Sequence, residues 1–153
     1  MPYVDTKEYV SMLKGLTEEG HLVSLLISGW SMTPFLSHER DTVYFKKPDR
    51  PLKVGDIVFY ERENGQYVLH RIRKCHGQET FDIVGDAQTL TECGVRRDRI
   101  FGLVVRAERK GRVLTPASPV WLFYSVIWIR LVPLRHLLIR FAHILKRSSR
   151  RGN

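Results

Sequence analysis

Three side chains in this sequence have the types that hydrolytic chemistry requires. Ser31 opens a Ser-Met-Thr-Pro segment, His70 precedes an arginine, and Asp86 follows a glycine. A serine hydroxyl is a weak nucleophile until a neighbouring base takes its proton. Histidine, with an unperturbed pKa of about 6.5, can accept that proton and return it near neutral pH. A carboxylate can hold the imidazole in place, so these residues could supply a nucleophile, a base and an orienting acid.

Short segments that alternate apolar and polar side chains surround these residues. Such alternation is typical of β-strands, and Asn64-Gly65 is a strong hairpin signal. Tight turns between so many short strands predict a mainly β protein, an antiparallel and partly closed β-domain. The expected strands cover residues 22–27, 42–46, 56–61, 66–73, 80–84, 100–108 and 112–114.

Five short sequence blocks, taken in their order along the chain, resemble the motifs of the signal peptidase I family of serine endopeptidases. The resemblance runs from about Val23 to Val105. Histidine stands where classical bacterial members and the related self-cleaving repressors carry lysine, so the likeness is to the His-type branch of archaea, the endoplasmic reticulum and some bacteria. The blocks are Ser31-Met32-Thr33-Pro34, Gly55-Asp56-Ile57-Val58, His70-Arg71-Ile72, Gly85-Asp86 and Ile100-Phe101-Gly102-Leu103-Val104.

The resemblance implies a serine endopeptidase that cuts a signal-like or leader-like peptide through an acyl-enzyme. Ser31 would be the nucleophile, His70 the general base and Asp86 the orienting acid, with no metal or organic cofactor. His-type members carry a second acid six residues further on, and Glu92 stands at that position. The family also implies an extended substrate with small side chains before the cut.

The oxyanion hole departs from the family pattern. Many members carry a hydroxyl residue two positions before the nucleophile, where this chain has Gly29; Ser28 lies one position further back. The backbone N–H of Ser31 can still donate to an oxyanion. We therefore expect Ser31, with Ser28 as a second candidate, to form the hole.

Two other functions remain open. An inactive peptidase fold could bind a peptide or a membrane partner, and in that case Ser31 would cap a turn and His70 would be a half-buried strand residue. A self-cleaving regulator of the repressor clan is the second. It would need an Ala-Gly or Cys-Gly cleavage linker, and residues 1–20 offer little room for one.

The sequence divides into an N-terminal helix at 1–21, a peptidase-like β-domain at 22–115 and a basic C-terminal tail at 116–153. A cap at Asp5 or Thr6 begins the helix, and Gly20 ends it. The expected packing residues of this helix are Tyr9, Met12, Leu13 and Leu16.

The tail carries the excess positive charge of a 153-residue chain whose net charge is +9, because Glu108 is the last acidic residue. An apolar run from Val120 to Ile129 precedes an amphipathic helix beyond Pro133. Such richness in apolar side chains argues against nucleic acid and favours an anionic membrane surface as partner. The expected basic face contains Arg135, His136, Arg140, His143, Lys146 and Arg147.

A membrane span is not the expected arrangement of this tail. A span needs about 20 apolar residues, and extending the run would bury Arg130, Arg135 and Arg140 in hydrocarbon. We expect the tail to lie in the interface of a bacterial or archaeal cytoplasmic membrane, on either face. The competing interpretation is that the helix covers an apolar surface of its own domain or of a partner. Because Ser31, His70 and Asp86 precede the tail, a chain ending near Pro116 is expected to stay folded and active.

Overall fold

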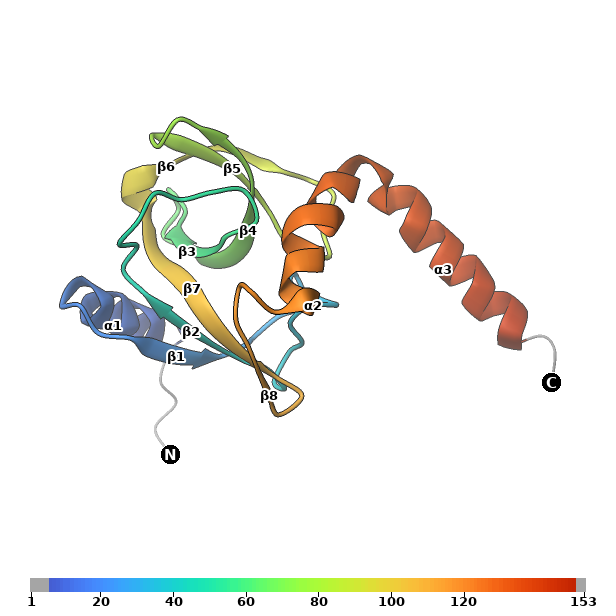
Figure 1. The fold of residues 1–153 in the computed structure, drawn as a ribbon, viewed down its shortest axis with the longest axis horizontal. Coiled ribbons are helices and arrows are strands. Elements are labelled where there is room, and N and C mark those ends of the chain that lie inside the picture. Colours follow the sequence, from blue (N-terminus) through green and yellow to red (C-terminus); the bar gives the residue numbers. More distant parts are fainter. Residues whose placement is uncertain (1–5, 151–153) are drawn as a thin grey trace.

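The structure is a computed structural model that describes residues 6–150, with side chains up to residue 148. Eight strands form one antiparallel sheet in the order β1-β2-β7-β3-β4-β5-β6, with β8 paired to β7 (Figure 1). The mainly β, antiparallel prediction is confirmed. The sheet is open, because its edges β1 and β6 do not pair with each other. The strands are β1 (Val23–Leu26), β2 (Thr42–Lys46), β3 (Ile57–Glu61), β4 (Tyr67–His76), β5 (Thr80–Val84), β6 (Glu92–Arg96), β7 (Ile100–Arg109) and β8 (Arg112–Leu114).

Strand β6 is the element that the sequence pattern did not predict. It is an edge strand in which Val95 alone is buried, while Cys93 and Gly94 are exposed. Such a strand lacks the apolar alternation that makes a strand visible in a sequence. The Asn64-Gly65 hairpin is confirmed: Gly65 has a φ of 82°, and the Asn64 Oδ1 accepts from the Gln66 N–H at 3.0 Å.

Apolar side chains form a separate cluster on each face of the central strands. Because successive side chains of a strand point to opposite faces, Phe59 packs with Phe45 and Phe101 in one cluster while Tyr60 joins Phe81 in the other. β3 is therefore buried from Ile57 to Tyr60.

Helix α1 (Thr6–Glu18) covers the first of these clusters with a face that matches the expected one only in part, since Leu13 is buried as expected. Val10 and Leu13 are buried, whereas Tyr9 and Met12 are exposed. Leu16 packs at the margin of the cluster, as expected. Gly20, with a φ of 90°, follows the end of the helix. The expected cap at Asp5 lies outside the described residues.

The C-terminal segment contains four helical elements in succession. They are α2 (Pro119–Leu122), η2 (Phe123–Ile127), η3 (Trp128–Leu134) and α3 (Arg135–Arg150). The first three pack on the sheet: Trp121 and Tyr124 enter the cluster of Phe59, and Ile129 packs with Val84. Gly55 permits this approach, since a Cβ there would lie 2.7 Å from the Cβ of Ser125. This half of the tail is part of the domain.

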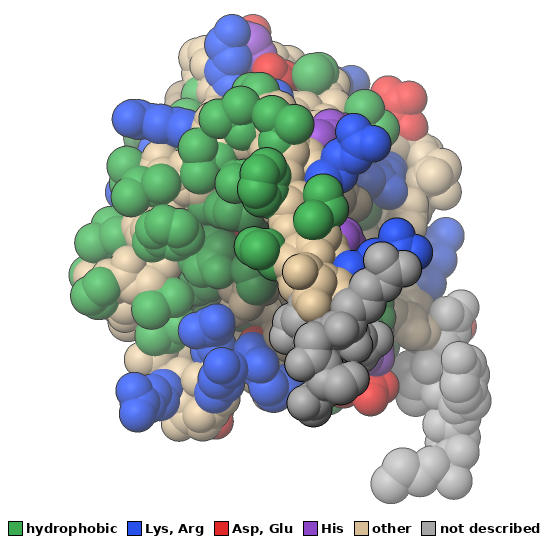
Figure 2. Space-filling model, turned by 90° about the vertical axis from the view of Figure 1, so that its right-hand side faces the viewer, with side chains coloured by type: hydrophobic (Ala, Val, Ile, Leu, Met, Phe, Trp, Pro, Cys, Tyr) green, Lys and Arg blue, Asp and Glu red, His purple; other side chains and the backbone are tan. Residues whose placement is uncertain are grey.

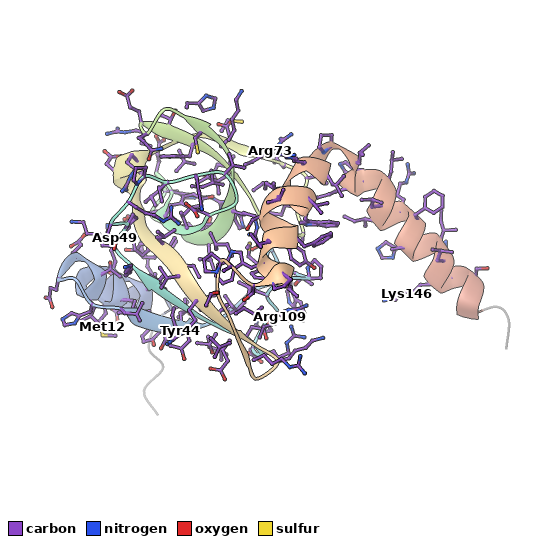
Figure 3. The ribbon with its side chains drawn as sticks, in the orientation of Figure 1. Met12, Tyr44, Asp49, Arg73, Arg109 and Lys146 are labelled. Carbon is purple, nitrogen blue, oxygen red and sulfur yellow. The ribbon has the colours of Figure 1, made fainter. Side chains whose placement is uncertain are left out.

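Helix α3 projects away from the sheet (Figure 1). Lys146 lies near its distal end, far from the β-domain (Figure 3). The helical stretch Pro119–Ser148 is 30 residues long and is apolar enough to cross a membrane. Its exposed apolar side chains, here called the apolar surface, gather on one side of the molecule with Lys and Arg at the margin (Figure 2). The ten most exposed large side chains among them, to which this name refers, are Leu122, Phe123, Val126, Ile127, Leu134, Leu137, Leu138, Phe141, Ile144 and Leu145.

Arg135 does not belong to the exposed basic face that the helical projection predicts. Its side chain is fully buried, and the guanidinium donates to the carbonyls of Gly85, Gln88 and Trp128 at 2.8–3.0 Å. The projection was wrong here because it places a residue by angle alone, whereas the first turn of α3 still contacts the domain.

Candidate active site

Ser31 lies in the turn that follows β1. Gly29 begins that turn with a φ of 97°, a conformation that favours glycine. Its N–H donates to the His38 Nδ1 at 2.8 Å. Ser31 is half-buried and lines an open cavity of about 750 Å³, together with residues of β1 and His70.

The Gly85-Asp86 block packs directly against the backbone of Ser31. The Ala87 N–H donates to the Ser31 carbonyl at 2.9 Å. A Cβ at Gly85 would lie 2.6 Å from the same oxygen, so glycine is required for this approach. Two blocks far apart in the sequence are therefore in direct contact, and Gln88, just after the second block, lines the cavity together with Ser31.

His70 lies on β4, paired with Val58 of β3, and its side chain reaches the same cavity as Ser31. Only 3% of its surface is exposed. Burial, together with the charge of Arg62, lowers the pKa of His70 to about 4, although the charge of Glu92 acts in the opposite direction. The imidazole is therefore uncharged at neutral pH, the form that can accept a proton. No hydrogen bond joins its ring to the Ser31 hydroxyl within residues 6–150.

Asp86 is bound to Arg71 and not to His70. Its two carboxylate oxygens accept from the Arg71 Nε and Nη2, both at 2.8 Å, and both side chains are fully buried. Strand alternation explains the pairing: His70 and Arg71 are consecutive on β4 and point to opposite faces, and Asp86 follows Val84, the residue paired with Arg71. A direct contact of Asp86 with the imidazole is absent from this structure.

The tail closes over the Arg71–Asp86 pair. The Arg71 Nη1 donates to the Gly55 carbonyl and to the Ser125 hydroxyl, both at 3.0 Å. The Trp128 Nε1 donates to the Asp86 carbonyl at 2.8 Å. These bonds satisfy polar groups that would otherwise be buried without partners. We call this set of residues the buried junction: Gly55, Arg71, Asp86, Ser125, Trp128 and Arg135.

Glu92 is the acidic residue whose charge acts on His70. Its carboxylate accepts from the Tyr60 hydroxyl at 2.6 Å and from the Arg62 Nε at 3.0 Å. Burial and the hydrogen bond to Glu92 raise the pKa of Tyr60, which keeps the phenol protonated as a donor. Glu92 and Arg62 are each about one-third exposed. Glu92 lines a second cavity, of about 670 Å³, that His70 also borders.

Two oxyanion donors remain compatible with the geometry. Within residues 6–150 the Ser31 N–H makes no hydrogen bond, and Ser28 is exposed beside the same cavity. A backbone donor beside the nucleophile is the usual way to stabilise a tetrahedral oxyanion.

Comparison of the chain with protein-family models, with curated proteins and with solved structures yields no match. Functional interpretation therefore rests on the residues and their geometry. Sequence reasoning missed the roles of Tyr60, Arg62, Trp128 and Arg135, which become neighbours of the site only through folding. The sequence showed that Arg71 follows His70, but it did not show that the carboxylate partner of Arg71 is Asp86.

Proposed function

We propose that this protein is a serine endopeptidase of the signal peptidase I type, with Ser31 as nucleophile and His70 as general base. The observation that carries the proposal is that Ser31 and an uncharged, buried histidine line one cavity. β1 borders that cavity, and among the described strands it pairs only with β2, so no described strand occupies its other edge. An extended peptide can add to such an edge through backbone hydrogen bonds.

In the proposed reaction the Ser31 oxygen attacks the scissile carbonyl carbon while its proton passes to His70. The Ser31 N–H, with Ser28 as second donor, stabilises the oxyanion. The tetrahedral intermediate expels the amine, which receives the proton from His70, and the acyl group remains on Ser31. Water then attacks the ester with His70 again as base, which releases the carboxylate product and restores the serine.

The two acids support this chemistry in different ways. Asp86, proposed as the orienting acid, acts through Arg71 and through the Gly85–Gln88 loop that touches Ser31. Glu92, the second acid, acts on His70 by its charge. An anion near the imidazole stabilises the imidazolium that forms when Ser31 loses its proton.

We further propose that the enzyme works at an anionic membrane surface on which α3 lies. The apolar surface would enter the lipid interface, and Arg140, Lys146 and Arg147 would approach the headgroups. Arg135 takes no part, since the domain itself binds its guanidinium. Monotopic placement keeps the cavity of Ser31 outside the hydrocarbon.

A fluorophosphonate probe tests the nucleophile directly. Wild-type protein is expected to be labelled and to cleave leader-like peptides, and Ser31→Ala is expected to lose both properties without loss of folding. Thr33→Ala serves as a matched control in the same turn. Labelling that is unchanged in Ser31→Ala would refute the peptidase proposal, and an unlabelled wild type would favour the inactive binding module.

Cleavage of an added peptide separates this proposal from a self-cleaving regulator. An endopeptidase cuts the peptide at a rate proportional to enzyme concentration. A self-cleaving regulator would instead shorten its own chain at a rate independent of concentration and leave the peptide intact. Peptidomics of cells carrying wild type or Ser31→Ala would then identify the substrates.

A further inference from the structure

The second cavity, of about 670 Å³, has one wall from the sheet domain and one from the projecting helix. Glu92 and Leu90 contribute from the domain side, and His136 and Ile139 contribute from α3. Arg62, His70 and Gln88 border both this cavity and the one that contains Ser31. The two cavities therefore meet at His70.

We infer that this second cavity binds the part of the substrate that follows the scissile bond, an inference that rests on the proposed peptidase function. β1 borders the first cavity, which would hold the acyl portion of the peptide. The general acid must donate its proton to the nitrogen of the leaving amine. The chain attached to that nitrogen therefore starts at His70, where the second cavity opens.

The helical wall of the cavity is held in place by buried contacts. Arg135 joins the start of α3 to the carbonyls of Gly85 and Gln88. Ile139 lies one helical turn after Arg135 and so on the same face of α3. Because Gln88 borders both cavities, the same loop fixes the helix relative to His70.

The lining indicates the class of peptide that the cavity accepts. Arg62 and Glu92 are paired at 3.0 Å and compensate each other's charge. Leu90 is 85% exposed and Ile139 is 39% exposed, which leaves apolar surface for a ligand to cover. An uncharged segment with an apolar side chain, placed between Leu90 and Ile139, matches this lining best.

Two substrates that share every residue before the cut test the inference on the full-length protein. One ends in an aminocoumarin leaving group, and the other continues for several residues with an apolar side chain after the cut. Ile139→Ser is expected to lower kcat/KM for the long substrate about tenfold, which is the size of effect that apolar pockets have on the discrimination between substrates. For the short substrate, kcat/KM is expected to change less than about twofold. In lipid-free solution with these soluble substrates, Ile144→Ser, on the same helix outside the cavity, is expected to change kcat/KM for neither substrate.

Each outcome bears on a different claim. Equal effects of Ile139→Ser on both substrates, or none on either, would overturn the second cavity as a substrate site while the peptidase proposal stands. An equal loss with Ile144→Ser would assign the effect to the helix as a whole and would also overturn it. A wild type that cleaves neither substrate would refute the proposed function and this inference together.

Discussion

Two arginine–carboxylate pairs stand on opposite sides of β4, and their surroundings differ. Arg71–Asp86 is fully buried, bidentate and covered by the tail. Arg62–Glu92 is about one-third exposed and borders two open cavities at His70. A buried pair is costly to break because an uncompensated charge remains, whereas an exposed pair contributes little to stability. The first pair therefore holds the structure, and the second can adjust the chemistry.

Truncation within the tail is expected to give the largest effect. A chain ending at Pro116 loses the cover of the buried junction, the buried Arg135 and four buried hydrophobic side chains, those of Trp121, Tyr124, Ile129 and Val132. Each large-to-small loss of this kind costs about 2–5 kcal/mol, so we expect unfolding, against the expectation from sequence. A chain ending at Arg140 should keep its thermal transition, because the side chains of residues 141–148 are all exposed. A folded, active protein ending at Pro116 would refute the structural role of the tail.

Substitution of the two acids should separate their roles. Asp86→Asn leaves Arg71 buried without its counter-charge and is expected to cost about 3–5 kcal/mol of unfolding free energy. Glu92→Gln is expected to cost less than about 1 kcal/mol while lowering kcat. Urea unfolding and peptide cleavage measure the two effects. If Glu92→Gln proved the more destabilising, the contrast between the pairs would be wrong.

The titration of His70 should respond oppositely to its two charged neighbours. Arg62→Gln removes a cation that lowers the pKa of His70, and Glu92→Gln removes an anion that raises it. NMR of the imidazole should show the pKa rising above about 4 in the first variant and falling in the second. Shifts in the same direction would exclude this electrostatic arrangement.

The same burial makes stability depend on pH. The unfolded histidine binds a proton at a pKa of about 6.5, whereas the folded one binds it only at about 4. The unfolded state therefore gains protons first, and stability should fall as the pH drops from about 6.5 to 4, by about 3 kcal/mol. Above pH 6.5 this contribution is constant. His70→Gln should remove this part of the slope in urea unfolding.

Substitution of single basic residues of α3 should give the smallest effects, which are measured on the binding of the protein to vesicles. Replacing Arg140, Lys146 or Arg147 by Gln is expected to weaken binding to anionic vesicles about fivefold each at low salt. Salt should reduce these differences, since charges are screened beyond about 10 Å at 0.1 M. Arg96→Gln, on exposed β6, is the control. Vesicle binding that is unchanged in all three variants would contradict the proposed membrane surface.

The local pattern of apolar and polar residues was sufficient to predict most strands of the sheet. Seven of the eight strands lie on segments that were predicted from sequence, either by alternating side chains or, for Val23–Leu26, by a continuous apolar run. The hairpin at Asn64-Gly65 follows from the conformational freedom of glycine in the turn. β6 was not predicted from the sequence, because an exposed edge strand contains almost no pattern of apolar residues. Ser31 and His70 were predicted to share a site, and they line one cavity.

Only the tertiary structure decided which charges meet. Asp86 pairs with Arg71 because strand alternation and the register of β4 with β5 place them on one face, away from His70. Glu92 reaches the surroundings of His70 through the hydrogen bonds of Tyr60 and Arg62, residues from a distant strand and its turn. Arg135 became a buried anchor because the tail folds back on the Gly85–Gln88 loop. Sequence spacing determines which way a side chain points from its own element, whereas its partner depends on which elements pack together.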